Sequence, residues 1–366
     1  MKKNILIFLS IASLIIFSFS INNSNKLNRD LNSFEKGKDQ IPFDRNAENF
    51  TPIIDSHVHF MPFGGEAIPF SDLIDYFRKT NVRFVNVYGI GQRVPIDSDC
   101  TYYLDCPGVP VLPTIKNDII NAENFIKSKP KDIHLTISMT FPDLANPGDI
   151  LKKMEILDDE YPNVFNWMGE VNLIKQALLN NFHEPAILED ISKWKDFMGE
   201  LNERKIPINI HSDLGNNQSN TKYLFLMEEV LKLYPNNKIV WAHMGLSKEL
   251  SNMNPNEHIK IMKRLLNHYP NLMLDITWRV LEDNYFKKYR DLYVNFFNNY
   301  SEKILPGTDF VASANKNFDS YKTDLMVTSE INKYLNDKAF RDIVLGNNYF
   351  RLLDLNYEAP IISLKK

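Results

Sequence analysis

The chain has few cysteines and no surplus of positive charge. Its 366 residues include only Cys100 and Cys106, and the formal net charge is −4. Their spacing matches no common thiolate zinc site, so metal binding by these cysteines is not expected. The pair can close a small disulfide loop in an oxidising compartment or remain as two free thiols. Without a basic surplus or a basic stripe, no nucleic-acid partner is expected.

Long apolar runs are also scarce, and the only pronounced one lies at the amino terminus. After a basic start, residues 5–20 are apolar apart from serines, and Ser18 and Ser20 place small residues at a signal-peptidase spacing. The run falls short of the about 20 residues of a membrane-spanning helix. We therefore predict a cleaved signal peptide over residues 1–20 and a periplasmic or secreted protein. An uncleaved membrane anchor is the alternative, and it would be the only contact with a membrane.

Residues 21–50 are rich in Asn, Lys, Asp and Ser and are predicted to form a polar linker. From residue 51 onward, β-rich runs alternate with helical patterns, which favours a parallel sheet built from βα units. Several runs are almost wholly apolar, as in a sheet buried on both faces. Eight such units predict an α/β fold, a (β/α)8 TIM barrel that forms one catalytic domain over residues 51–366. The predicted strands are 52–59, 83–88, 133–140, 164–171, 207–211, 238–243, 272–277 and 304–309.

Two histidines end the first predicted strand. His57 and His59 are two positions apart, so in a strand both side chains point to the same face. Both imidazoles can then reach one divalent ion at about 2.0–2.1 Å, and zinc or a similar metal suits them. The alternative is a pair of buried, hydrogen-bonded histidines.

Further polar residues stand at the carboxyl ends of other predicted strands. A barrel brings these ends together at one mouth, where its chemistry is found. Four imidazoles and two carboxylates are a sufficient ligand set for one or two divalent ions. The candidate metal ligands are His57, His59, Glu170, His211, His243 and Asp309.

In this order, the motifs resemble those of the metal-dependent amidohydrolase superfamily, most closely its amidohydrolase-2 branch. The resemblance implies a distorted (β/α)8 barrel with a mononuclear or binuclear metal centre. It also implies that His57, His59 and Asp309 bind the first metal and that His211 binds a metal in either arrangement. His243 would be a ligand of a second metal or a free acid/base. The motifs are Ile54-Asp55-Ser56-His57-Val58-His59, Ile210-His211, Trp241-Ala242-His243-Met244-Gly245, Gly307-Thr308-Asp309-Phe310 and residues 345–353.

Glu170 bears on the number of metals. Many binuclear members of the superfamily bridge their metals with a carboxylated lysine, whereas this chain resembles the glutamate-bridged members, such as TatD-like deoxyribonucleases and some lactonases. Glu170 therefore favours two metals. Alternatively, it hydrogen-bonds an imidazole and orients it.

The catalytic residues are expected to be Asp309, as proton shuttle, and His243. Four residues near strand ends are expected to contact a small-molecule substrate: Tyr88, Arg93, Trp278 and Arg279, the last through bidentate bonds to a carboxylate or phosphate. His134 is expected at the opposite end of the barrel, and His258 and His268 on a helix surface.

The leading functional hypothesis is an exported metal-dependent hydrolase that uses metal-activated water on an ester, lactone, amide or phosphoester. One alternative is a metal-dependent non-oxidative decarboxylase, which the amidohydrolase-2 branch includes. The other is a non-catalytic binding protein on the same barrel, although unused buried ionisable groups would be costly. A homo-oligomer is left open.

Overall fold

A computed structural model describes residues 29–95 and 97–363 of the chain. The predicted signal peptide lies outside these residues. Within them, no helix combines the length and apolar character needed to cross a membrane.

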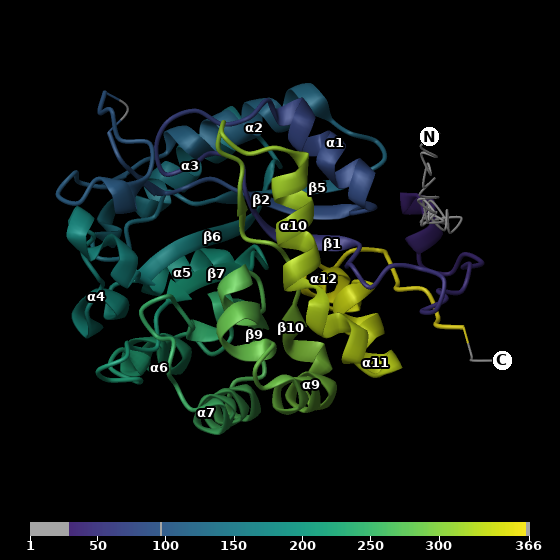
Figure 1. Cartoon of the computed structure of the whole chain (residues 1–366). Coiled ribbons are helices and arrows are strands. Elements are labelled where there is room, and N and C mark those ends of the chain that lie inside the picture. Colours follow the sequence, from purple (N-terminus) through teal and green to yellow (C-terminus); the bar gives the residue numbers. More distant parts are fainter. Residues whose placement is uncertain (1–28, 96, 364–366) are drawn as a thin grey trace, which may run out of the picture.

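A curled sheet of parallel strands forms the centre of the molecule, with helices around it (Figure 1). All eight predicted strands are present, so the predicted barrel is confirmed. In spatial order, the sheet consists of β10 (Ile304–Leu305), β9 (Leu272–Asp275), β8 (Ile239–Trp241), β7 (Ile208–Ser212), β6 (Phe165–Ile174), β5 (His134–Met139), β2 (Phe84–Tyr88), β1 (Ile54–His59) and β11 (Phe310–Val311).

Two short strands close the barrel at the eighth position: β10 lies within the predicted range 304–309, and β11 lies just beyond it. β10 pairs with β9, whereas β11 pairs with β1, and the turn between them contains Pro306 and Gly307. Pro306 has no N–H for a ladder, but its carbonyl accepts a hydrogen bond from Ser56 N at 3.1 Å. Asp309 N then donates to His57 O at 2.9 Å. Asp309 is therefore tied directly to the strand that carries the two histidines.

The helices alternate with the strands, as the sequence pattern predicts. Two helices, α4 (Leu188–Ser192) and α5 (Lys195–Glu203), lie between β6 and β7. Tyr161, Tyr234 and Tyr269 each end a helix just before a proline, which cannot continue one. The helices are α1 (Phe70–Thr80), α2 (Lys116–Ser128), α3 (Ile150–Glu160), α4 (Leu188–Ser192), α5 (Lys195–Glu203), α6 (Leu224–Leu233), α7 (Pro255–His268), α8 (Arg279–Leu281), α9 (Arg290–Asn299), α10 (Phe318–Thr328), α11 (Asp337–Ala339) and α12 (Asn347–Leu352).

A bulge in β1 sets the direction of its side chains. The register with β2 shifts between Asp55 and Val58. Ile54, before the bulge, packs in an apolar cluster with Phe84, Trp167 and residues of α12. A bulge inserts one residue and so exchanges the faces of the strand beyond it. The amino-terminal part of the barrel is thus filled with apolar side chains, and the carboxyl end is left for His57 and His59.

The described part of the predicted polar linker, residues 29–50, packs against the barrel and is part of the fold. Phe34 is fully buried, and its ring centroid lies 5.5 Å from that of Phe84. Phe43 is buried as well, with its ring 5.4 Å from that of Phe340. These two aromatic side chains cover apolar surface at the end of the barrel opposite the histidines. The polar composition of the segment gives no indication of this packing.

A loop with a disulfide follows β2. Cys100 and Cys106 are joined, which is one of the two states left open by the sequence. A short antiparallel pair, β3 (Gln92–Arg93) and β4 (Leu112–Pro113), flanks this loop. Inside it, Tyr103 is buried with its ring 4.5 Å from that of Phe63.

Candidate metal centre

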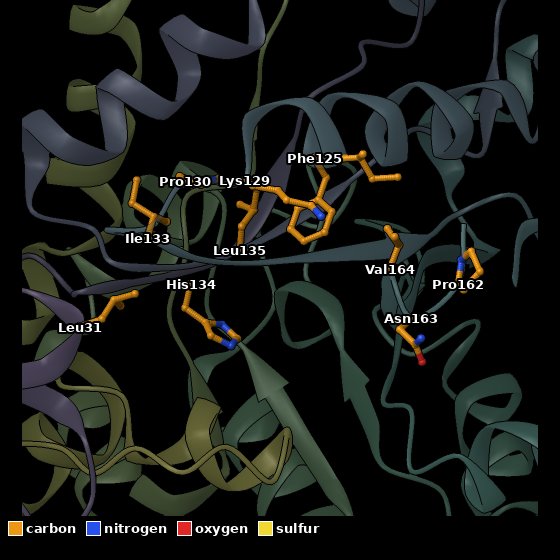
Figure 2. Close-up of a pocket in the computed structure, with 11 residues that line it drawn as sticks. Leu31, Phe125, Lys129, Pro130, Ile133, His134, Leu135, Pro162, Asn163 and Val164 are labelled. Atoms are coloured by element: carbon orange, nitrogen blue, oxygen red, sulfur yellow. The ribbon is translucent and has the colours of Figure 1, made fainter. Parts of the chain in front are cut away.

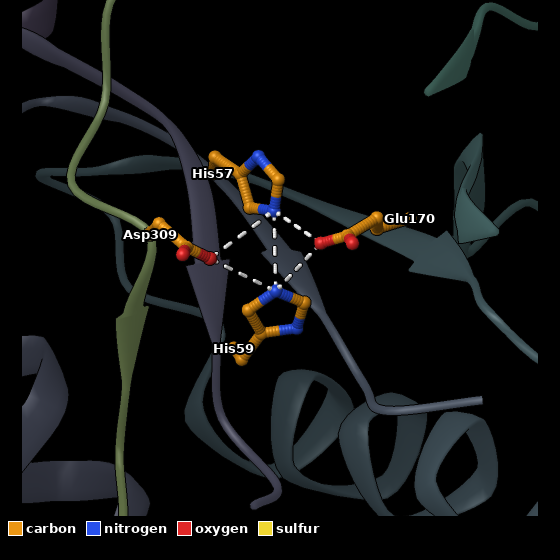
Figure 3. Close-up of side chains that lie close together, drawn as sticks. All are labelled: His57, His59, Glu170 and Asp309. Atoms are coloured by element: carbon orange, nitrogen blue, oxygen red, sulfur yellow. Dashed lines mark hydrogen bonds and ion pairs between the residues drawn. The ribbon is translucent and has the colours of Figure 1, made fainter. Parts of the chain in front are cut away.

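Four of the predicted ligands converge on one point at the carboxyl ends of the strands (Figure 3). His57 Nε2 lies 3.1 Å from His59 Nε2, and Glu170 Oε2 lies 3.0 and 3.2 Å from these two nitrogens. Asp309 Oδ1 completes the group at 3.6 and 3.3 Å from the same nitrogens. We refer to these four residues as the primary cluster.

The hydrogen bonds behind the primary cluster determine which ring nitrogens face it. His59 Nδ1 donates to the carbonyl of Gly89 at 2.6 Å, and His57 Nδ1 donates to Asp275 Oδ2 at 2.7 Å. In the neutral rings the Nε2 lone pairs must then face each other and two carboxylate oxygens. Such an arrangement requires a positive charge at its centre.

A divalent metal fits this requirement. Ligands at about 2.0–2.1 Å around a tetrahedral ion are about 3.4 Å apart, close to the spacings in the primary cluster. Two imidazoles and two carboxylates also suit zinc chemically. Burial disfavours a charged His57, but Asp275 and Glu170 raise its pKa well above the usual value.

The second oxygen of Glu170 faces a different set of groups. Oε1 lies 2.7 Å from His211 Nδ1 and 2.8 Å from the ammonium of Lys175. His211 Nε2 in turn donates to Asp213 Oδ1 at 3.0 Å. Burial opposes ionisation of Glu170, but the charges of Lys175 and His211 hold its pKa well below the usual value. Glu170 is therefore a buried carboxylate shared between two groups of partners.

His243 lies on a turn directly after β8, with a left-handed backbone at φ 53°. Its Nδ1 lies 3.1 Å from Thr277 Oγ1, and the Thr277 hydroxyl donates to Asp275 Oδ1 at 2.5 Å. Because the single hydrogen of that hydroxyl is already donated to Asp275, the oxygen accepts a hydrogen bond from His243 Nδ1–H. The Nε2 atom of neutral His243 is then a free acceptor. His243, Glu170 and His211 each offer a ligand atom within 4.8 Å of the others.

Two polar residues of the centre were not among the predicted ligands. Asp275 bonds to His57 and, through Thr277, to His243, and it is fully buried. It ends β9, just as the other site residues end their strands, and this position is the signal that could have identified it. Lys175 directly follows β6, and a cation at a strand end beside Glu170 is a comparable signal.

A cavity of about 950 Å³ opens over the centre. Its wall includes His59, His211, His243 and Asp309, together with Lys175. Residues of the disulfide loop, among them Tyr103, line the same cavity. A small organic molecule would therefore reach the primary cluster from this side.

The structure separates the four predicted substrate contacts into two pairs. Trp278 and Arg279 line the cavity, and Arg279 is half-exposed with Nε 3.4 Å from Asp283. Tyr88 is fully buried, and its ring centroid lies 4.6 Å from that of His57. Arg93 is not among the cavity-lining residues and bonds Gly65 O at 3.3 Å. Neither Tyr88 nor Arg93 lies on the cavity wall: Tyr88 packs against the His57 ring, and Arg93 bonds the adjacent loop.

The histidines outside the centre lie largely as expected. His134 begins β5 at the opposite end of the barrel, beside a separate apolar pocket of about 570 Å³ that Figure 2 shows. His268 is exposed at the end of α7. His258 was expected on the surface but is fully buried, and Nε2 donates to Met244 O at 3.0 Å. The apolar side of α7 faces inward, and His258 falls on that side.

We compared the chain with protein families, curated sequences and solved structures. Residues 173–348 match the model of a family described as amidohydrolase. No curated protein sequence matches the chain. A zinc-bound amidohydrolase from Burkholderia multivorans has a similar structure, with a TM-score of 0.51 at 11% identity, over 82% of this chain and 99% of that one.

Two further structures share the fold. Beta-aspartyl dipeptidase from Fervidobacterium islandicum, solved with a dipeptide, has a TM-score of 0.51 at 14% identity, over 84% of this chain and 74% of that one. Dihydroorotase from Saccharomyces cerevisiae has a TM-score of 0.50 at 11% identity, over 84% and 85%. The family match includes the strands that carry His211, His243 and Asp309. The match to the amidohydrolase family thus covers slightly less than half of the chain, and the solved structures share its barrel fold.

Proposed function

We propose that the protein is an exported enzyme that hydrolyses an ester, lactone, amide or phosphoester bond in a small molecule, with zinc as its metal. The observation that carries this proposal is the primary cluster at the bottom of the cavity, where two imidazole lone pairs and two carboxylates converge. The zinc bound in the amidohydrolase from Burkholderia multivorans supports the choice of metal.

His57, His59, Glu170 and Asp309 would hold the metal. When bound, a divalent ion acts as a Lewis acid and lowers the pKa of a coordinated water. Asp309 is suited to the proton transfer because only Oδ1 lies in the cluster, and Oδ2 makes no hydrogen bond to any residue in the described ranges. Asp309 therefore accepts the proton of the attacking water and passes it to the leaving group. His243 offers Nε2 to the substrate from the cavity wall.

Replacement of Asp309 by asparagine tests this mechanism. The amide oxygen can still coordinate, but it is a far weaker proton acceptor than a carboxylate. We expect Asp309→Asn to retain much of its zinc and to lose at least about 10²–10⁴-fold in kcat/KM on the substrate found in a panel of esters, lactones, amides and phosphodiesters. His59→Ala is the matched control and should lose zinc and activity together. Near wild-type turnover by Asp309→Asn would refute the proton-shuttle role.

Export forms a separate part of the proposal. The basic start, the apolar run over residues 5–20 and the small residues at its end support a cleaved signal peptide. The mature chain is then expected to begin near Ile21. Intact-mass measurement of protein from its native host would reveal the processed terminus, and a mass that includes residues 1–20 would instead indicate an anchor.

One observation favours a second candidate, non-oxidative decarboxylation. His243 stands outside the primary cluster, so its Nε2 is available to act as an acid or base without a metal. Carbon dioxide release from aromatic or unsaturated carboxylic acids, measured with the same purified enzyme, separates this reaction from hydrolysis.

A further inference from the structure

The two oxygens of Glu170 face two different sets of side chains. Oε2 faces His57 and His59 in the primary cluster. Oε1 faces the Lys175 ammonium at 2.8 Å and His211 Nδ1 at 2.7 Å. In a centre with two ions bridged by this carboxylate, Oε1 would face the second ion. Here an ammonium group of the chain itself lies against that oxygen.

The spacings around Oε1 differ from those of the primary cluster. Ligands of one tetrahedral ion stand about 3.4 Å apart, because each is about 2.0–2.1 Å from the metal. The primary cluster has separations of 3.0–3.6 Å, whereas Oε1 lies only 2.7 Å from His211 and 2.8 Å from Lys175. Lys175 donates a charge-assisted hydrogen bond to Oε1, whereas His211 Nδ1 lies at ion-pair distance without hydrogen-bond geometry. The distances around Oε2 leave room for an ion.

Lys175 is also well fixed in this position. Its side chain is only 14% exposed, and the ammonium lies 5.4 Å from the ring centroid of Phe63. The next residue, Gln176, donates its backbone N–H to Asp213 Oδ2 at 2.7 Å, which holds the chain directly after β6. A divalent ion bound at Oε1 would lie beside this ammonium in a site with little water to screen the repulsion.

We propose that Lys175 supplies the second positive charge of the centre, so that the protein binds a single divalent ion in the primary cluster. The inference rests on the proposed metal-dependent function and specifies its centre. It departs from the two-metal expectation based on Glu170. It also leaves His211 as a partner of Glu170 instead of a metal ligand. Removal of the charge of Lys175, without removal of its hydrogen bond, should open a second metal site at Glu170, His211 and His243.

The test counts ions in three forms of the full-length mature protein. Lys175→Gln keeps an N–H donor toward Glu170 and removes the charge, whereas Lys175→Arg keeps the charge. Each protein is saturated with zinc, dialysed against chelator-treated buffer and measured by elemental mass spectrometry. We expect about one zinc per chain in the wild type and in Lys175→Arg, and about two in Lys175→Gln. Two ions in the wild type, or one in Lys175→Gln, would overturn the inference.

A spectroscopic measurement gives a second readout of the number of bound ions, in case one variant fails to fold. After exchange with cobalt(II), two neighbouring ions couple magnetically, and the electron paramagnetic resonance signal per cobalt falls. We expect this loss in Lys175→Gln and in Lys175→Met, but not in the wild type. Coupling in the wild type would refute the one-ion centre. If the wild type bound no zinc at all, the proposed metal-dependent function itself would fail, which is a distinguishable result.

Discussion

At the scale of single residues, the chemistry of the centre depends on atoms that never touch the metal. The Gly89 carbonyl and the Asp275 carboxylate each accept a hydrogen bond from an Nδ1–H group, and so direct the Nε2 lone pairs of His59 and His57 into the primary cluster. Such outer partners orient metal-binding imidazoles and raise their basicity. Asp275 also accepts a hydrogen bond from the Thr277 hydroxyl, whose oxygen in turn accepts a hydrogen bond from His243 Nδ1–H.

Asp275→Asn should therefore weaken metal binding without removing any ligand of the primary cluster. Loss of such a partner reduces metal affinity about 10–100-fold in comparable sites. The measurement is competition for zinc against a chromogenic chelator. Asp213→Asn is the matched control, because it removes the corresponding partner of His211, and in a one-ion centre it should leave zinc affinity near the wild-type value. Equal loss in both variants would mean that His211 is a metal ligand.

At the scale of elements, α7 positions the turn that carries His243. His258 on α7 donates from Nε2 to the carbonyl of Met244, and its Nδ1 accepts from Tyr293 at 3.0 Å. Both bonds require the neutral ring. Burial lowers the pKa of His258 from 6.5 to about 4. The contact between α7 and the turn after β8 therefore includes an imidazole, that of His258, whose neutral form is favoured by burial.

This group makes the stability of the fold depend on pH in a defined direction. Between pH 6.5 and about 4, the unfolded chain binds a proton at His258 that the folded chain does not. The stability contribution is thus complete above pH 6.5 and is lost as the pH falls toward 4. The loss amounts to about 3 kcal/mol in the free energy of unfolding.

Urea denaturation at a series of pH values measures this dependence. His258→Gln removes the titrating group and should flatten the slope between pH 6.5 and 4. His268→Gln, at an exposed position on the same helix, should leave the slope unchanged. An unaltered slope in His258→Gln would contradict the buried neutral state.

At the scale of the whole molecule, the chain before β1 closes one end of the barrel while the chemistry lies at the other. Phe34 packs in the same apolar cluster as Phe84 and Phe350. Arg29 donates to Glu48 at 2.8 Å and ties the two ends of this segment together. The barrel is therefore covered by residues that precede it in the sequence, and its stability should depend on them.

Phe34→Ala should cost about 3–5 kcal/mol in the free energy of unfolding, because it empties a fully buried aromatic site. Ile41→Ala, in the same segment at a half-exposed position, should cost far less. Chemical denaturation of both variants with bound zinc gives the comparison. A cost for Phe34→Ala as small as that for Ile41→Ala would mean that this segment adds little to the barrel.

The local pattern of the chain was sufficient to predict the barrel and the primary cluster. Alternation of apolar strands with helices is a short-range property, and so is the two-residue spacing of His57 and His59. Because parallel strands bring their carboxyl ends to one side, the position of Glu170 and Asp309 at strand ends was enough to group them with the histidines. These features need no knowledge of which side chains finally touch.

The remaining features depend on contacts between distant parts of the chain, and only the folded structure reveals them. The partner of His57 at Nδ1 is Asp275, 218 positions away, and no local pattern specifies such a pair. Tyr88 points beneath the histidines, not into the cavity, because one residue of register decides the face of a strand. Phe34 and Phe43 anchor a segment whose composition is polar. Lys175 lies only five positions from Glu170, but only the folded barrel brings His211 to the same Glu170 oxygen.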